Sequence, residues 1–290
     1  MDVESCIEAY TALAEDIFTP RNRTMFGGAF LHKVVGSATF SAEKLEAGIK
    51  KVIRDSQDRG NNADRAGGAS GIFEAVEDLP MLRGDRQKCR VCICLYGMEN
   101  NQAYRIRSYE SKNEPGLPMT VWQAARATSA APTLFNPIAI GNTTTLRDGG
   151  LRNNNPIMEV MEELEHEFYA RGSDIACIVS IGTGVSKTDF FQNRDILKSV
   201  AEICAKIATD TKTIEATFRN VYAAAGKPLR ERYFRFEVDQ GLRGMGMEEW
   251  KKMSEVFSVT TTYLSDGARR EAMGKCAATL AIGNAAPQVE

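Results

Sequence analysis

The stretch that decides the fold runs from Trp122 to Pro156 and reads WQAARATSAAPTLFNPIAIGNTTTLRDGGLRNNNP. It joins a helix of small residues, a proline stop, a short apolar segment and an acid followed by two glycines. Few structural tasks need these features in this order. One such task is to hold a carboxylate, that of Asp148, at the end of a strand beside a turn that another group can approach closely.

The acid in this stretch, Asp148, is followed directly by Gly149 and Gly150. The glycines permit positive φ angles and close backbone approach. The asparagine run that ends at Asn155, with Pro156 after it, is expected to turn the chain and cap the next helix. This pattern suits a general base at the lip of a sheet, where reactive groups of open α/β folds gather. The alternative is an ordinary Asp-Gly turn, which the acid and the glycines alone favour.

The preceding segment, ARATSAAP, strengthens the functional interpretation. Its alanines keep one helix surface nearly bare, and a bare surface permits very close packing against a neighbouring element. Tight cores contain such surfaces too, so both interpretations stay open at this point. The alanines are Ala124, Ala125, Ala127, Ala130 and Ala131.

Length and composition restrict the class of protein. The chain has 290 residues, of which 43% are hydrophobic and 26% charged, as in a globular protein with a sizeable core. A net charge of −2 gives no indication of a nucleic-acid partner. Seven cysteines, an odd number spread along the chain, indicate reduced and mostly buried thiols. No apolar run approaches the roughly 18 residues that a membrane span needs, so we expect a cytoplasmic protein without a transmembrane segment.

Hydrophobic spacing predicts helices that alternate with strands. The strand expected at 175–181 is an unbroken apolar run, which indicates burial on both faces. We therefore predict one α/β domain over residues 1–290, with a mainly parallel sheet covered by helices on both faces. Helices are expected at 2–18, 41–55, 120–129, 155–170, 195–209, 211–225 and 248–280 (broken near 266–267), strands at 89–96, 104–109, 175–181 and 233–238, and a polar loop at 58–71.

Two further patterns give weaker signals for a bound ion. The spacing Cys89-x-x-Cys92-x-Cys94 lacks the second ligand pair of a zinc site, so strand thiols are the better interpretation. The run from Gly182 to Gly184 lacks the complete spacing of a phosphate-binding loop, which favours a plain turn. No pattern indicates a metal or an organic cofactor.

The remaining candidate residues are basic side chains and histidines. Arg21, Arg23 and Lys33 flank an apolar stretch, so this segment could contact lipid headgroups at a membrane surface or form a solvated loop. His32 and His166 are interpreted as structural, because nothing in the sequence places either beside Asp148 to complete a triad.

Four motifs occur along the chain in a fixed order. They are ARATSAAP, Phe135-Asn136-Pro137, the DGG-L-x-x-NNP run that begins at Asp148, and the SIGTG run that begins at Ser180. The combination resembles the patatin-like phospholipases, most closely those of filamentous fungi. The resemblance implies hydrolysis of acyl esters of phospholipids or related glycerolipids by a Ser–Asp dyad, with the serine in a G-x-S-x-G elbow after an oxyanion loop. It assigns the aspartate of the dyad to Asp148 and implies no cofactor.

The nucleophilic serine of that scheme is missing from the sequence, which contains no G-x-S-x-G. Ser70 lacks the second spacer of the motif, Ser37 has no following glycine, and neither follows a buried strand. Against the family pattern, the first strands, the oxyanion loop and the nucleophile elbow are absent, and we expect a chain truncated at its N-terminus. An aspartate base without a serine has no proton to take, so this chain is expected to be inactive as it stands.

Two alternatives stay open beside the incomplete enzyme. One is a non-catalytic relative that binds lipid or a protein partner. The other is an unrelated nucleotide-binding α/β protein that uses the turn from Gly182 to Gly184.

Overall fold

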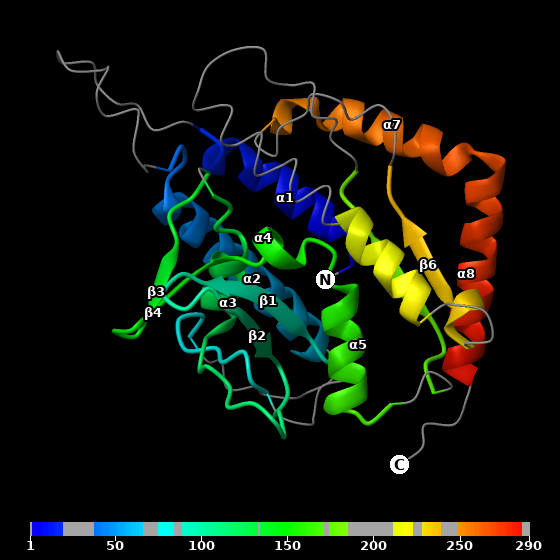
Figure 1. Ribbon diagram of the computed structural model, residues 1–290. Coiled ribbons are helices and arrows are strands. Elements are labelled where there is room, and N and C mark those ends of the chain that lie inside the picture. Colours follow the sequence, from blue (N-terminus) through cyan, green and yellow to red (C-terminus); the bar gives the residue numbers. More distant parts are fainter. Residues whose placement is uncertain are drawn as a thin grey trace, which may run out of the picture. The chain divides into compact units, whose positions relative to one another are not determined.

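The computed structural model describes residues 2–19, 38–65, 75–83, 89–132, 134–170, 174–184, 211–222, 228–238 and 249–285. These residues belong to two compact units, Met1–Arg152 and Asn153–Glu290, and each unit is described by itself (Figure 1). The single domain expected over residues 1–290 stays a prediction.

The first unit begins with two packed helices, α1 (Val3–Ile17) and α2 (Ala42–Arg65). The helix expected from residue 2 is confirmed, and its N-cap is Asp2, whose side chain accepts a hydrogen bond of 2.7 Å from the Ser5 N–H. Helix α2 continues past its predicted end at residue 55, so the loop expected from residue 58 is wrong as far as residue 65. Propagation of an established helix adds one hydrogen bond per residue, which here outweighs the polar composition that suggested a loop.

The sheet of the first unit has four strands in the order β2-β1-β4-β3, namely β1 (Cys92–Gly97), β2 (Ala103–Arg107), β3 (Ile138–Ile140) and β4 (Thr144–Asp148). All three strand pairings are antiparallel, so the mainly parallel sheet predicted from the sequence is wrong for this unit. The physical reason lies in the connections at 98–102 and 141–143, because a parallel crossover needs roughly a dozen residues or more. Each connection contains a left-handed residue, Asn101 (φ 57°) or Gly141 (φ 62°).

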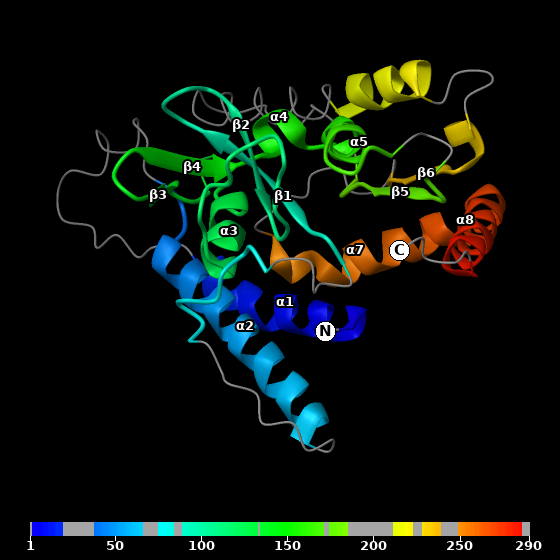
Figure 2. The same cartoon turned by 90° about the horizontal axis from the view of Figure 1, so that it is seen from below.

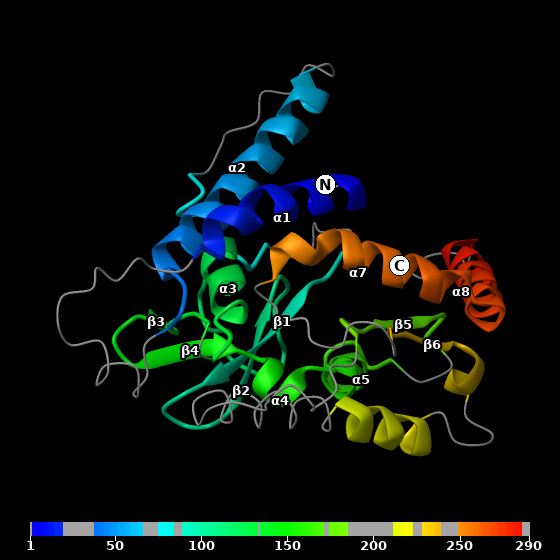
Figure 3. The same cartoon turned by 90° about the horizontal axis from the view of Figure 1, so that it is seen from above.

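Helix α3 (Val121–Thr128) lies between this sheet and the pair formed by α1 and α2 (Figures 2 and 3). A capping box sets its start, as the Thr120 hydroxyl accepts from the Gln123 N–H and the Gln123 side chain accepts from the Thr120 N–H. The three helices lie on the same side of the sheet in these views, and the prediction of helices on both faces stays untested. The core between α3 and the sheet includes Leu95, Ile106, Ala124, Ala127 and Leu146.

The second unit contains a two-stranded parallel sheet formed by β5 (Ile178–Ile181) and β6 (Tyr233–Phe236). Helix α5 (Ile157–His166) and the helix at 211–221 contribute to the core beside it. The predicted burial of β5 on both faces is wrong, because Val179 is 39% and Ile181 78% exposed while Ile178 is buried. The core residues of this unit are Ile157, Met161, Ile175, Ile178, Phe218, Leu229 and Tyr233.

Two further helices, α7 (Met253–Ser265) and α8 (Gly267–Ala285), belong to the second unit. The predicted break between them is confirmed at Asp266, whose carboxylate accepts hydrogen bonds of 3.1 Å from the Ala268 and Arg269 N–H groups at the start of α8. Short 3-10 helices span Pro228–Glu231 and Trp250–Lys252. The helix predicted at 195–209 lies outside the described residues.

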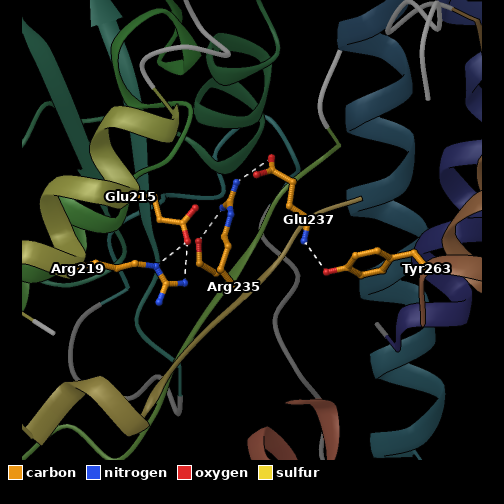
Figure 4. Close-up of polar contacts among 6 residues, drawn as sticks. Glu215, Arg219, Arg235, Glu237 and Tyr263 are labelled. Carbon is orange, nitrogen blue, oxygen red and sulfur yellow. Dashed lines mark hydrogen bonds and ion pairs between the residues drawn. The ribbon is translucent and has the colours of Figure 1, made fainter. Parts of the chain in front are cut away.

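A polar cluster joins the ends of β5 and β6 to α7 (Figure 4). The guanidinium of Arg235 donates from Nη1 to Ser180 Oγ at 2.8 Å, and its Nη2 pairs with Glu237 Oε1 at 2.9 Å. The Glu237 N–H donates to the Tyr263 hydroxyl at 3.2 Å. A Cβ atom on Gly182 would lie less than 3.0 Å from both members of the Arg235–Glu237 pair. Gly182 of the SIGTG motif therefore makes room for this ion pair.

Substitution of this glycine tests the packing of the cluster. Gly182→Ala is expected to lower the free energy of unfolding by about 1–3 kcal/mol, because the new methyl group must displace two largely buried side chains. The control is Gly274→Ala in α8, where nothing lies within 4 Å of the new Cβ and a gain of about 0.5–1 kcal/mol is expected. Urea unfolding measures both changes, and equal effects of the two substitutions would contradict the packing argument.

Candidate functional site

The candidate site is built around Asp148, the last residue of β4. Strand β4 has a neighbouring strand on each side in the four-stranded sheet. Asp148 lies opposite Leu95 of β1 in the strand register. Its N–H donates to the carbonyl of Ala130, just beyond α3, at 3.3 Å. Strand pairing and the α3 segment together therefore fix the backbone that carries the carboxylate.

The carboxylate of Asp148 lies half-buried, and its Oδ1 accepts a hydrogen bond of 2.7 Å from the Gly150 N–H. Burial raises the pKa of Asp148 above its ordinary value, and the Gly150 N–H partly opposes this shift. A carboxyl group with a raised pKa is better matched to proton transfer near neutral pH than an ordinary aspartate.

Gly149 allows the turn after Asp148 to pack directly on the backbone of β1. A Cβ atom at this position would lie less than 3.0 Å from the carbonyl carbon and oxygen of Cys94. The Thr128 hydroxyl of α3 donates to the same carbonyl oxygen at 3.4 Å. The sequence suggested close approach or positive φ here, and the structure uses close approach. The described glycines with positive φ are Gly141 and Gly184.

Gly150 begins α4 (Gly150–Asn153), a single helical turn that the sequence did not predict. The turn directs the Gly150 N–H at the Asp148 carboxylate. Arg152 at the other end donates from Nη1 to the carbonyl of Asn101, in the connection between β1 and β2, at 2.9 Å. The turn after β4 is therefore held at both ends within the first unit.

Asn155 and Pro156 lie at the start of α5, but they do not cap it as predicted. Pro156 occupies the N-cap position and provides no side-chain hydrogen bond, and the helix begins one residue later, at Ile157. Asn155 is 1% exposed, and neither of its amide atoms has a hydrogen-bond partner among the described residues. The side chain of Asn154 donates to the Thr211 hydroxyl at 3.0 Å instead.

Several other predicted candidates lie outside the described residues, namely Ser37, Ser70, His32, Arg21, Arg23 and Lys33. His166 is exposed in the last turn of α5, and Cys92 and Cys94 are half-buried thiols on β1. In the described ranges, no group of three or more His, Cys, Asp or Glu side chains could bind a metal ion. None of the helices in the described part of the chain combines the length and the apolar character of a membrane span.

Sequence reasoning missed the contacts that the α3 segment makes with this site. The Ala130 carbonyl and the Thr128 hydroxyl both belong to the ARATSAAP run, which drew attention for its bare surface. That surface is a real packing feature, since Ala124 and Ala127 are fully buried. The pattern indicated close packing, but it could not identify which backbone groups would meet.

The close approach at Gly149 predicts a severe effect of a single methyl group. Gly149→Ala is expected to lower the free energy of unfolding by about 3 kcal/mol or more, because the backbone of a paired strand cannot move aside as a flexible side chain can. Gly116→Ala is the matched control, with nothing within 4 Å of its new Cβ and an expected change within about 1 kcal/mol. Urea unfolding of both variants checks the contrast, which a mild Gly149→Ala effect would refute.

The raised pKa of Asp148 predicts how stability depends on pH. A carboxyl group whose folded-state pKa lies above its unfolded value stabilises the fold below the unfolded pKa and loses that contribution as pH rises through the folded pKa. Asp148→Asn removes the charge and keeps an oxygen that can accept from Gly150. This variant should therefore unfold at a higher temperature than the wild type at pH 7, with a gain that shrinks as pH falls toward 3.8.

Asp2 provides a control of opposite sign for that experiment. Its exposed carboxylate caps α1, and the hydrogen bond from Ser5 lowers its pKa. Asp2→Asn should therefore lower the unfolding temperature at pH 7 and match the wild type at acidic pH. A loss of stability in Asp148→Asn at neutral pH would show that the Asp148 charge is favourable, as in an ordinary solvated turn.

Comparison with known proteins finds relatives whose sequences are similar to part of this chain. Calcium-independent phospholipase A2-gamma of Oryctolagus cuniculus is 38% identical over 101 residues, which are 34% of this chain and 12% of that protein. Its namesake in Rattus norvegicus is 33% identical over 123 residues, which are 42% of this chain and 15% of that protein. A protein named probable inactive patatin-like protein 9, of Arabidopsis thaliana, is 26% identical over 173 residues, or 54% of this chain and 43% of its own length.

The chain thus spans less than half the length of each of these relatives. The family model described as patatin-like phospholipase matches residues 3–161, a range that includes α3, β4 and the whole run from Asp148 to Pro156. This match extends over more than half of the chain and agrees with an α/β fold. The chain therefore belongs to the patatin-like phospholipase family.

Proposed function

We propose that this chain carries the aspartate of a Ser–Asp dyad that hydrolyses lipid acyl esters, with Asp148 as the general base. The observation that carries the proposal is the half-buried Asp148 carboxylate at the end of β4, held by the Gly150 N–H. Family membership supports it, as do relatives whose names describe calcium-independent phospholipases A2. The proposed substrates are acyl esters of phospholipids or related glycerolipids.

In the proposed reaction, the Asp148 carboxylate takes the hydroxyl proton of the serine while the serine oxygen bonds to the ester carbonyl carbon. The protonated carboxyl group then returns this proton to the oxygen of the departing alcohol. Burial favours these two proton transfers, because burial raises the affinity of the Asp148 carboxylate for a proton. The backbone contacts of Asp148 and Gly149 restrict the position of the base before the substrate arrives.

The serine of the dyad is not provided by a G-x-S-x-G within these 290 residues. We propose that this motif and the oxyanion loop are encoded upstream of the Met1 codon, in a patatin-like protein of the fungal type that forms one domain. The 290-residue chain would then be inactive as it stands. The complete protein would be cytoplasmic and would contact membranes peripherally to reach its substrate.

A non-catalytic relative that binds lipid or protein is the second candidate. The absence of a G-x-S-x-G from the sequence favours it. The name of the Arabidopsis thaliana relative, probable inactive patatin-like protein 9, offers a precedent in the family. The coding sequence upstream of Met1 distinguishes the candidates, because only the incomplete enzyme requires an in-frame G-x-S-x-G there.

Esterase assays test the proposed role of Asp148. The 290-residue chain should hydrolyse short acyl esters no faster than its Asp148→Asn variant does, because the nucleophile is missing. Protein expressed from the longer reading frame should hydrolyse them, and Asp148→Asn should lower its kcat by about 10²–10⁴-fold. Asp2→Asn in the longer protein is the control and should keep full activity.

Two results would contradict this proposal in different ways. Activity of the longer protein that survives Asp148→Asn would exclude Asp148 as the base. Activity of the 290-residue chain that Asp148→Asn abolishes would mean that a serine inside this chain is the nucleophile.

A further inference from the structure

A guanidinium group lies inside the first unit at Arg126, in the last turn of α3. The residue is 3% exposed, and its Nη2 donates a hydrogen bond of 2.6 Å to the carbonyl oxygen of Asn136. The other terminal nitrogen, Nη1, is buried as well and has no hydrogen-bond partner among the described residues. The structure therefore buries a charged side chain whose clearest contact is with one backbone carbonyl.

A buried charge of this kind needs an explanation, because removing a guanidinium from water is costly unless its donors are paired. Burial lowers the pKa of the Arg126 guanidinium, and the acids Glu46 and Glu43 of α2 oppose that effect. The group is still charged at neutral pH, as arginine side chains in proteins are. An apolar side chain of similar length would avoid the cost of burial, but it could not donate to Asn136. The hydrogen bond to Asn136 is thus a feature that needs the arginine.

This hydrogen bond is made to the α3–β3 connection, the segment between the end of α3 and the start of β3. Near the start of the connection, the carbonyl of Ala130 accepts from the N–H of Asp148 at 3.3 Å. Just past its end, β3 pairs with β4, the strand that carries Asp148. Asn136 lies between these two contacts, so Arg126 ties the connection back to the helix that precedes it.

We propose that Arg126 is a positioning residue for the general base. Its guanidinium holds the α3–β3 connection, so that the Ala130 carbonyl keeps the end of β4, and with it the Asp148 carboxylate, in place. This inference rests on the function proposed above for Asp148. Arg126 does not contact the reacting groups, because it is almost completely buried. It acts through two hydrogen bonds, one from Arg126 to Asn136 and one from Asp148 to Ala130.

A second anchor of the α3–β3 connection separates this role from general packing. Phe135 is buried, with its ring centroid 6.0 Å from that of Phe18 and 5.8 Å from that of Phe40. Apolar contacts of this kind are non-directional, whereas the hydrogen bond from Arg126 fixes a backbone group in a defined geometry. Loss of the Arg126 guanidinium should therefore leave the aromatic anchor in place and loosen the end of β4.

Hydrogen exchange of the Asp148 amide, followed by NMR, tests the contact in the 290-residue chain. Arg126→Met removes the donor and keeps a long side chain in its place. We expect the Asp148 N–H to exchange about tenfold faster than in the wild type, as the weakening of one hydrogen bond implies. The reference is the Met98 N–H, which donates to the Thr145 carbonyl at 3.0 Å near the other end of β4. Its exchange rate should change much less.

Arg107→Met is the matched control, because Arg107 is also a buried arginine but pairs with Glu114 at 2.8 Å from the edge strand β2. This variant should keep the wild-type ratio of the Asp148 and Met98 exchange rates. The proposal is overturned if Arg126→Met leaves that ratio unchanged, or if Arg107→Met alters it as strongly. Should Arg126→Met fail to fold, Arg126→Lys decides the question. It keeps the charge without the planar fork and should raise the ratio about threefold.

Kinetics of the longer protein separate this inference from the function on which it rests. Arg126→Met should lower kcat about tenfold or more and leave KM unchanged, because a displaced base slows proton transfer while a buried side chain does not bind substrate. Arg107→Met should keep the wild-type kcat. A wild-type kcat in Arg126→Met would overturn the positioning role. If the longer wild-type protein is itself inactive, the function proposed for Asp148 fails, and the exchange ratio still decides whether Arg126 holds the end of β4.

Discussion

The contact between Gly149 and the Cys94 carbonyl sets how closely β4, β1 and α3 approach one another, and the candidate site depends on it. The same carbonyl accepts from Thr128, and the carbonyl of Ala130 accepts from the N–H of Asp148. These contacts are to backbone groups, and a backbone in a paired strand has little freedom to relax. A larger residue at Gly149 would therefore separate β4 from β1 and displace the carboxylate. The bare alanine surface of α3 is the complementary requirement on the helix side.

The sequence predicted those elements whose signals are local. The helices expected from residues 2 and 120 start at caps, Asp2 and Thr120, that depend on residues within one helical turn. Strand direction was predicted wrongly, because it depends on which strands pair and on how short their connections are. The asparagine run that includes Asn101 and the glycine at Gly141 marked two tight hairpin turns. If these two connections had been interpreted as hairpin turns, the sequence would have predicted an antiparallel sheet.

The candidate site was predictable in part, since its acid and glycines are consecutive in the chain. From the sequence, a glycine at position 149 has two possible reasons, positive φ or close backbone approach, and only the contact with the distant strand β1 decides between them. Tertiary packing also decides the role of Asn155. The sequence predicted that this residue caps the next helix, but its side chain is buried and does not cap α5. Contacts of this kind come from tertiary packing.

The charge of Asp148 separates the catalytic interpretation from the structural one. An asparagine at this position could accept the same hydrogen bond from Gly150 without the cost of burying an ionised group. Desolvation is the larger influence on the Asp148 pKa and the Gly150 hydrogen bond the smaller, so the ionised form is a net burden on the fold. The architecture of the turn therefore needs an acceptor at this position but does not need an acid. A purely structural turn does not require an ionisable group in a half-buried place, whereas the general base proposed for Asp148 does.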